Sequence, residues 1–99
     1  MALPQRPKYK TYTRQGIKYD RVELSLKYLL IRRKLEKEVE AELEEFIEYL
    51  ESKGRHVRRY QIGNGLCFTY WDIKKRILKE KYNIEWHSPP ELNPRVRFD

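Results

Sequence analysis

Apolar residues between positions 35 and 50 recur at steps of four, four, three and four, which is the period of one face of an α-helix. This apolar stripe consists of Leu35, Val39, Leu43, Phe46 and Leu50. Asp20 followed three residues later by Glu23 is a helix-capping pair, and Gly54 is a typical residue for a helix end. The pattern therefore predicts one long helix over residues 21–53.

The remaining elements are expected to be shorter. Polar and apolar residues alternate over positions 22–28, so a strand over 17–26 followed by a shorter helix is an open alternative. A second helix is expected to begin near Thr69 and Asp72 and to run to about Tyr82. Short strands are expected at 8–13, at 56–62 and 66–68 as a hairpin, at 84–86 and at 96–98.

These elements predict the fold class and the organisation of the chain. A chain of 99 residues is one small domain, able to bury only a modest core. We expect residues 1–16 to be a basic extended arm or an edge strand, and residues 17–99 to be a single α+β domain. That domain would contain one long charge-segregated helix, a second shorter basic helix and a small antiparallel sheet.

Charges along the predicted long helix are sorted by sign. The basic residues are Lys27, Arg32, Arg33, Lys34 and Lys37, and the glutamates that follow are Glu38, Glu40, Glu42, Glu44, Glu45, Glu48 and Glu51. Cations near the N-terminus and anions near the C-terminus oppose the helix dipole, which favours the reverse order by up to about 1 kcal/mol per charge. The sorting does not stabilise the isolated helix, so it indicates recognition by another surface.

The expected partner surface is a protein, and a second copy is the simplest case. A helix over 21–53 would be about 50 Å long and would extend beyond a domain of this size. An antiparallel copy would match basic half to acidic half in a twofold homodimer. The expected interface is the apolar stripe Leu35, Val39, Leu43, Phe46 and Leu50, with Arg33 and Lys37 near the partner's glutamates. Alternatively, the glutamates are only a solvated face and the stripe packs on the protein's own sheet.

Nucleic-acid binding is the second functional hypothesis, because the net charge is +7. The expected phosphate contacts are Arg6, Lys8, Lys10 and Arg14 in the arm and Lys75, Arg76 and Lys79 in the second helix. Tyr9, Tyr12 and Trp71 are candidates for stacking on bases. Ordinary solubilising charge is the alternative explanation of the same residues.

Catalysis finds little support in the sequence. His56, His87 and the single cysteine, Cys67, lack metal-ligand spacing, and no nucleophile, phosphate-loop or dinucleotide motif occurs. We therefore expect no enzyme activity, no metal, no cofactor and no small-molecule substrate. No apolar run approaches a membrane span, so we expect no membrane insertion and a cytoplasmic protein.

Composition adds an indication of heat stability. Eleven Lys and twelve Glu stand against three Asn, three Gln, one Cys and one Met, as is typical of hyperthermophile proteins. The segments IRRKLEKEVEAELEEFIEYLESKGR and TYWDIKKRILKEKYNIEWHSPP resemble small proteins of filamentous and rod-shaped viruses of hyperthermophilic acidophilic archaea, particularly lipothrixviruses and rudiviruses. The resemblance implies a viral accessory protein, made in the host cytoplasm or carried in the virion, and stable to heat and acid. It assigns no functional residue.

Overall fold

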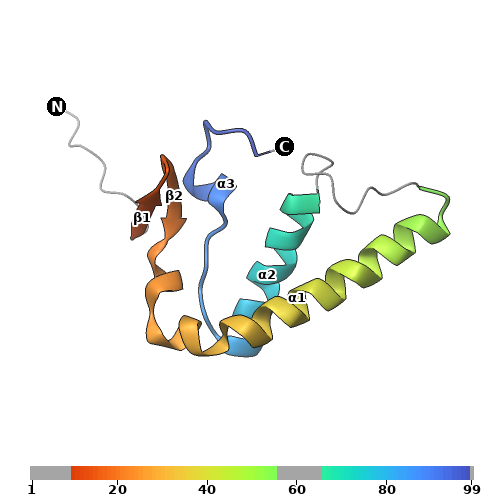
Figure 1. Cartoon of the computed structure of the whole chain (residues 1–99), viewed down its shortest axis with the longest axis horizontal. Helices are drawn as coiled ribbons and strands as arrows, with labels where there is room; N and C mark the ends of the chain where they lie inside the picture. The colour runs from red at the N-terminus through yellow and green to blue at the C-terminus, as the bar shows by residue number, and fades with distance from the viewer. Residues whose placement is uncertain (1–9, 56–65, 99) are drawn as a thin grey trace.

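The computed structural model describes residues 10–55 and 66–98, and these form a small single α+β domain (Figure 1). Two short strands, β1 (Thr11–Arg14) and β2 (Ile17–Asp20), are followed by a 3₁₀ turn, η1 (Arg21–Leu24). Three α-helices follow: α1 (Leu26–Ser52), α2 (Leu66–Tyr82) and α3 (Pro89–Leu92). The predicted fold class, with a long helix, a shorter helix and a small antiparallel sheet, is confirmed.

The sheet is a two-stranded antiparallel hairpin in which Tyr12 pairs with Tyr19 and Arg14 with Ile17. Gln15 and Gly16 both take positive φ, as a tight two-residue hairpin turn requires. The rings of Tyr12 and Tyr19 stack at 5.5 Å on one face of the hairpin. The edge-strand alternative therefore holds for residues 11–14, and residues 1–9 lie outside the described part of the chain.

The predicted long helix is divided in two at Ser25. Asp20 caps only η1, by accepting a hydrogen bond from the Val22 amide, and the Ser25 hydroxyl accepts one from the Tyr28 amide to begin α1. Glu23 accepts hydrogen bonds from the Trp86 indole at 2.9 Å and from the Tyr12 hydroxyl at 3.2 Å. The prediction of a helix from residue 21 is thus wrong at its start, because the backbone of Ser25 is extended, with ψ of 151°, and separates η1 from α1.

The predicted end of the helix is correct. Gly54 takes a φ of +82°, and its amide donates to the Glu51 carbonyl while the Arg55 amide donates to the Leu50 carbonyl. These two bonds satisfy carbonyls that the last helical turn leaves unpaired, in the Schellman pattern.

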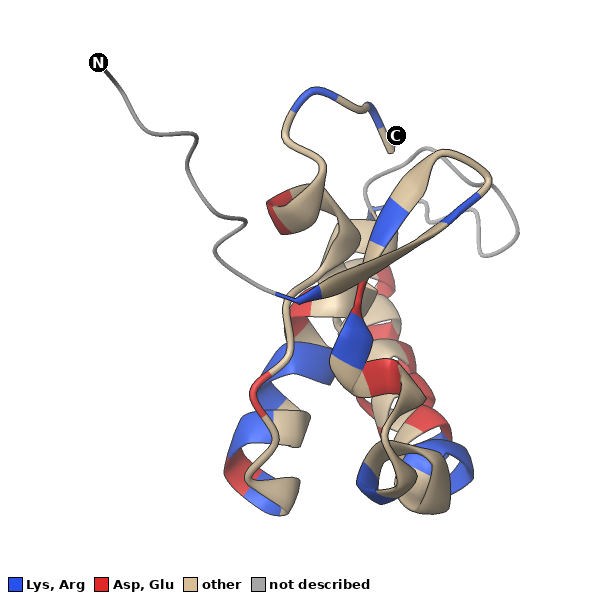
Figure 2. Cartoon of the chain, turned by 90° about the vertical axis from the view of Figure 1, so that its left-hand side faces the viewer, with Lys and Arg blue, Asp and Glu red and all other residues tan. Residues whose placement is uncertain are grey.

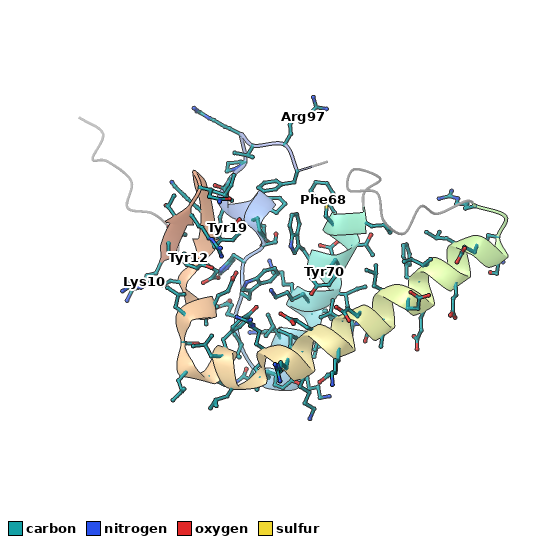
Figure 3. The ribbon with its side chains drawn as sticks, in the orientation of Figure 1. Lys10, Tyr12, Tyr19, Phe68, Tyr70 and Arg97 are labelled. Carbon is teal, nitrogen blue, oxygen red and sulfur yellow. The ribbon has the colours of Figure 1, made fainter. Side chains whose placement is uncertain are left out.

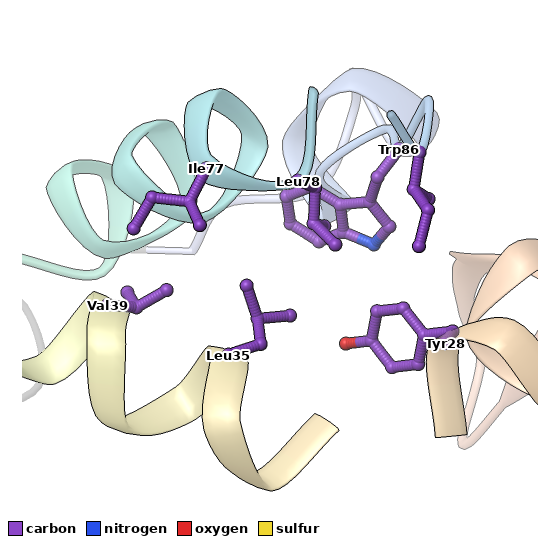
Figure 4. Packing of buried hydrophobic residues seen from close by; sticks show 7 residues of the cluster. Tyr28, Leu35, Val39, Ile77, Leu78 and Trp86 are labelled. Atoms are coloured by element: carbon purple, nitrogen blue, oxygen red, sulfur yellow. The ribbon is translucent and has the colours of Figure 1, made fainter. Parts of the chain in front are cut away.

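The core lies where the first half of α1 packs on α2 (Figure 4). Leu35 and Val39 are fully buried against this layer, together with Ile77 and Leu78 of α2. The extended segment 83–88, called the strap below, adds Trp86 to the core. Asn83, with a positive φ, reverses the chain after α2 so that the strap returns over the core.

Three of the predicted strands are wrong. Residues 66–68 form the first turn of α2, and residues 84–86 and 96–98 are in no strand. The side chain of Trp86 enters the core, and its polar neighbours in the strap are less deeply buried, which gives the alternating pattern of a strand. The amide of His87 donates to the Asp20 side chain and not to a neighbouring strand. Ser88 begins α3 through a capping box with Glu91. The predicted strand 56–62 and its turn at 63–65 lie outside the described residues.

Candidate interaction surfaces

The end of η1 and the start of α1 carry exposed apolar side chains, which we call the leucine patch. Its members are Leu24, Leu26, Leu29 and Leu30, which are 55%, 71%, 49% and 76% exposed. Leu26 is nine residues, or about two and a half turns, from Leu35, so it points away from the core. Fully burying a leucine contributes roughly 1.5–3 kcal/mol, so this surface is costly in a protein with so small a core. Contiguous exposed apolar patches of this kind mark interaction sites.

Five exposed basic side chains, which we call the cationic rim, lie close to the leucine patch along the chain. It consists of Arg21, Lys27, Arg33, Lys34 and Lys37, all exposed. Within residues 10–55 and 66–98, none of the five forms an ion pair. Glu36 lies in the same stretch and pairs with Arg32 at 3.6 Å. The basic positions gather at the start of α1 and the acidic positions follow (Figure 2). The sequence could have indicated the leucine patch, because Leu26, Leu29 and Leu30 have the i, i+3, i+4 spacing of a helix face that is separate from the apolar stripe.

A half-buried cation, Lys74, contacts the core beneath this end of α1. The Lys74 ammonium lies 4.6 Å from the Trp86 ring and 5.3 Å from the Tyr28 ring, which is cation–π geometry. Burial lowers the pKa of Lys74 and raises that of Tyr28. Tyr28 is buried in the core and Lys74 is half-buried beside it, so their contact helps to hold α1, α2 and the strap together.

The first glutamates in the acidic half of α1 bind side chains of α2 in the same chain. Glu38 accepts hydrogen bonds from the Lys81 ammonium at 2.6 Å and the Tyr82 hydroxyl at 2.5 Å, and these bonds lower the pKa of Glu38. Glu42 pairs with Arg76. Part of the charge sorting is therefore explained by an intramolecular contact between acidic α1 and basic α2.

Beyond Glu42, α1 continues for ten residues past its described ion pairs with α2. We call residues 43–52 the projecting end, because this part of the helix extends away from the body (Figure 1). Phe46 is 37% and Tyr49 58% exposed, whereas Ile47 is buried and Leu43 and Leu50 are half-buried. Glu45 and Glu48 are exposed and form no ion pair within the described residues. The projecting end is thus acidic, with two accessible aromatic rings.

The predicted dimer interface requires correction. Leu35 and Val39 are fully buried inside the protein, so they cannot contact a partner while the core is intact. Arg33 and Lys37 are each two residues from Leu35, which places them about 160° around the helix from it. A straight antiparallel pair of α1 helices cannot present both sides to one partner. The predicted interface residues therefore cannot all act together, and Leu43, Phe46 and Leu50 remain candidates for contact with a second copy.

The predicted nucleic-acid residues are only partly brought together. Lys75 pairs with Glu91, and Arg76 pairs with Glu42 and Glu80, so α2 offers Lys79 as its remaining exposed candidate. Lys10 and Arg14 are exposed on the hairpin, and Arg6 and Lys8 lie outside the described residues. Trp71 is half-buried and packs edge-on against Phe68 and Phe98.

Sequence reasoning missed a second basic group beside the hairpin. The side chain of Asn93 bonds to both the amide and the carbonyl of Lys18, which holds the C-terminal tail against β2. Arg95 and Arg97 in that tail are exposed, and Figure 3 shows Arg97 on the tail above the hairpin, with Lys10 at the lower end of the hairpin. We use the name hairpin–tail surface for the exposed basic residues of these two segments, which are Lys10, Arg14, Lys18, Arg95 and Arg97.

Asp20 and His87 form a pair that the sequence did not indicate. One carboxylate oxygen of Asp20 lies 2.8 Å from His87 Nδ1 and also accepts from the His87 amide, while the other accepts from Val22. A pocket of about 360 Å³ lies beside His87, lined by Lys75, Lys79, Glu85 and Glu91 among others. Asp20 is buried and joins the hairpin, η1 and the strap, which is a structural task.

The described residues contain no cluster of three His, Cys, Asp or Glu side chains that could hold a metal ion. The Cys67 thiol is half-buried and donates to the Phe98 carbonyl at 3.3 Å. Across residues 10–55 and 66–98, every helix is too short or too polar to cross a membrane. Comparison with known proteins found no matching family model, no matching curated protein and no matching solved structure.

Proposed function

We propose that this protein acts by binding another protein through the projecting end of α1, without catalysing a reaction. The observation that carries the proposal is the exposure of Phe46 and Tyr49 beside Glu45 and Glu48, on a helix that continues beyond its ion pairs with α2. A solvated helix end would not require exposed aromatic rings. Aromatic residues are enriched in protein interfaces and often dominate their affinity.

The charge of the projecting end defines the chemistry of its partner. Glu45 and Glu48 form no ion pair within the described residues, so they are available to a basic surface. Such complementarity accelerates association and selects the partner more than it strengthens the contact. The partner we propose is therefore a protein with a basic surface that also accepts the rings of Phe46 and Tyr49.

The test is capture of proteins by tagged full-length protein from an extract of the cells that make it, after digestion of nucleic acid. We expect basic proteins to be retained, and to be lost when Glu45→Lys is combined with Glu48→Lys or when Tyr49 is replaced by serine. Val96→Ser is the matched control, because Val96 is similarly exposed but lies in the tail. Equal capture by all four proteins would refute the proposal.

Nucleic acid is a second candidate partner, favoured by the hairpin–tail surface. Its five cations lie in the hairpin and the C-terminal tail. Among the described residues of these segments and of α3, the acidic side chains are Asp20, which is buried, and Glu91, which is paired with Lys75. A phosphate backbone approaching this surface would meet little repulsion, and binding would be independent of sequence and sensitive to salt. Gel-shift measurements with duplex DNA, comparing the protein with an Arg95→Gln and Arg97→Gln variant, test this candidate.

A further inference from the structure

The leucine patch has no role in the contacts described so far. Leu24 ends η1 and the other three leucines lie at the start of α1, at the opposite end of that helix from the projecting end, and Leu26 points away from the core. Together they expose about as much as two and a half fully solvated leucine residues. The patch belongs to a well-formed element, because Ser25 caps α1 and Tyr28 anchors it in the core. Its exposure is thus a property of the folded chain.

The composition of this surface differs from that of a protein interface. Protein interfaces are enriched in aromatic residues and arginine and depleted in lysine, and leucine is under-represented among their energetic centres. Here three lysines and two arginines lie close to the four leucines along the chain, and none of these exposed side chains is aromatic. Leucines on one side with Lys and Arg beside them are instead typical of helices that lie in the interface of a lipid bilayer.

The charge sorting of α1 suits an anionic surface. The cationic rim carries five positive charges, and the nearby Glu36 and Glu38 are each paired with a base. The next glutamate, Glu40, lies ten residues beyond Leu30, which is about 15 Å along the helix. That distance exceeds the screening length of about 8 Å at physiological salt. The acidic run therefore adds little repulsion where the leucines would touch the surface.

An anionic surface also accounts for the cations at the unfavourable end of the helix dipole. Lys27 lies in the first turn of α1, where a positive charge is destabilising in isolation. Lipid phosphates beside Lys27 and Arg33 would reverse that effect. Apolar side chains and basic residues also supply the two signals that stable peripheral binding requires, since either alone gives weak attachment.

We infer that the leucine patch and the cationic rim bind the surface of an anionic lipid bilayer. Leu24, Leu26, Leu29 and Leu30 enter the boundary between headgroups and acyl chains, and Arg21, Lys27, Arg33, Lys34 and Lys37 contact phosphates. The first half of α1 lies along the surface, and the chain does not cross the bilayer. The contact is independent of the protein partner proposed above, because the projecting end is free to point elsewhere.

Vesicle co-sedimentation of the full-length protein tests the inference. We expect binding to phosphatidylcholine vesicles that contain about a third phosphatidylserine or phosphatidylglycerol, little binding to pure phosphatidylcholine, and a loss of binding at high salt. Leu26→Gln combined with Leu30→Gln should lower the bound fraction at least tenfold. Both sites are exposed and glutamine is a good helix former, so folding is preserved and circular dichroism verifies it.

Two further variants separate lipid binding from general attraction. Arg33→Gln combined with Lys34→Gln should weaken binding and flatten its dependence on salt, whereas Tyr49→Ser at the projecting end should bind like the parent. Failure of the parent to bind anionic vesicles would overturn the inference. So would unchanged binding by the leucine variant, which would show attraction by net charge alone. A leucine variant that alters the sedimenting mass of the protein but not its lipid binding would assign the patch to a second copy.

Discussion

Replacing Leu35 by alanine distinguishes a core position from an interface position on the same helix. Leu35 is fully buried between α1 and α2, so Leu35→Ala removes buried methyl groups and leaves a cavity. Such changes cost about 2–5 kcal/mol, and the tight packing around Leu78 and Val39 favours a value of at least about 3 kcal/mol. A domain of this size is typically stable by about 5–15 kcal/mol, so the loss would be a large fraction of the total.

Leu30→Ala is the matched control. Leu30 lies five residues earlier on the same helix and is largely exposed, so the same substitution removes little buried area. Because alanine is the better helix former, the stability should change by no more than about 0.5 kcal/mol.

Urea unfolding followed by circular dichroism at 222 nm measures both variants. We expect the urea midpoint of Leu35→Ala to fall. In thermal unfolding, a loss of about 3 kcal/mol would lower the midpoint temperature by roughly 12–24 °C. Leu30→Ala should unfold like the parent. A loss below about 1 kcal/mol for Leu35→Ala, or equal losses for the two variants, would refute the assignment of Leu35 to the core.

Three further predictions follow. Sedimentation at micromolar concentration should show a monomer of 12.2 kDa, since Leu35 and Val39 are buried, and a stable dimer that Phe46→Ala dissociates would restore the predicted self-contact. The pKa of Glu38 is lowered in the folded state, so its contribution to stability is present at neutral pH and is lost as pH falls through that lowered value. The composition nevertheless predicts tolerance of heat and acid. Loss of helix early in heating at pH 2 would show that ion pairs dominate the stability. Removing residues 1–9 should lower affinity for duplex DNA and flatten its salt dependence, and a full-length protein that shifts no DNA at about 50 mM salt would end that hypothesis.

The sequence by itself determined the elements that depend on local chemistry. The apolar steps from Leu35 to Leu50 require a helix, and Gly54 ends it because glycine readily takes the left-handed conformation. The α+β class also followed, since one long helical period beside short alternating segments leaves few other arrangements. These features were predictable because each depends on residues within a few positions of one another.

Tertiary contacts decided the boundaries of those elements. Ser25 rather than Asp20 begins α1, and Glu23, the expected capping partner of Asp20, is instead bonded to Trp86, sixty-three residues away. The alternation at 84–86 has the period of a strand, yet the strap packs on α1 and α2 without joining the sheet. A local sequence pattern indicates which side chains are buried, but it does not indicate which other element of the fold packs on them.

Only the tertiary structure decided which residues of the apolar stripe are buried and which charges are paired. Leu35 and Val39 face α2 and become core, while Phe46, on the same side of the same helix, lies in the projecting end. Glu42 likewise pairs with Arg76, thirty-four residues away, whereas the cationic rim meets no such partner within the described residues. Period and charge are properties of the helix alone, but burial and pairing depend on where α2 crosses it, and that crossing is set by packing between residues distant in the chain.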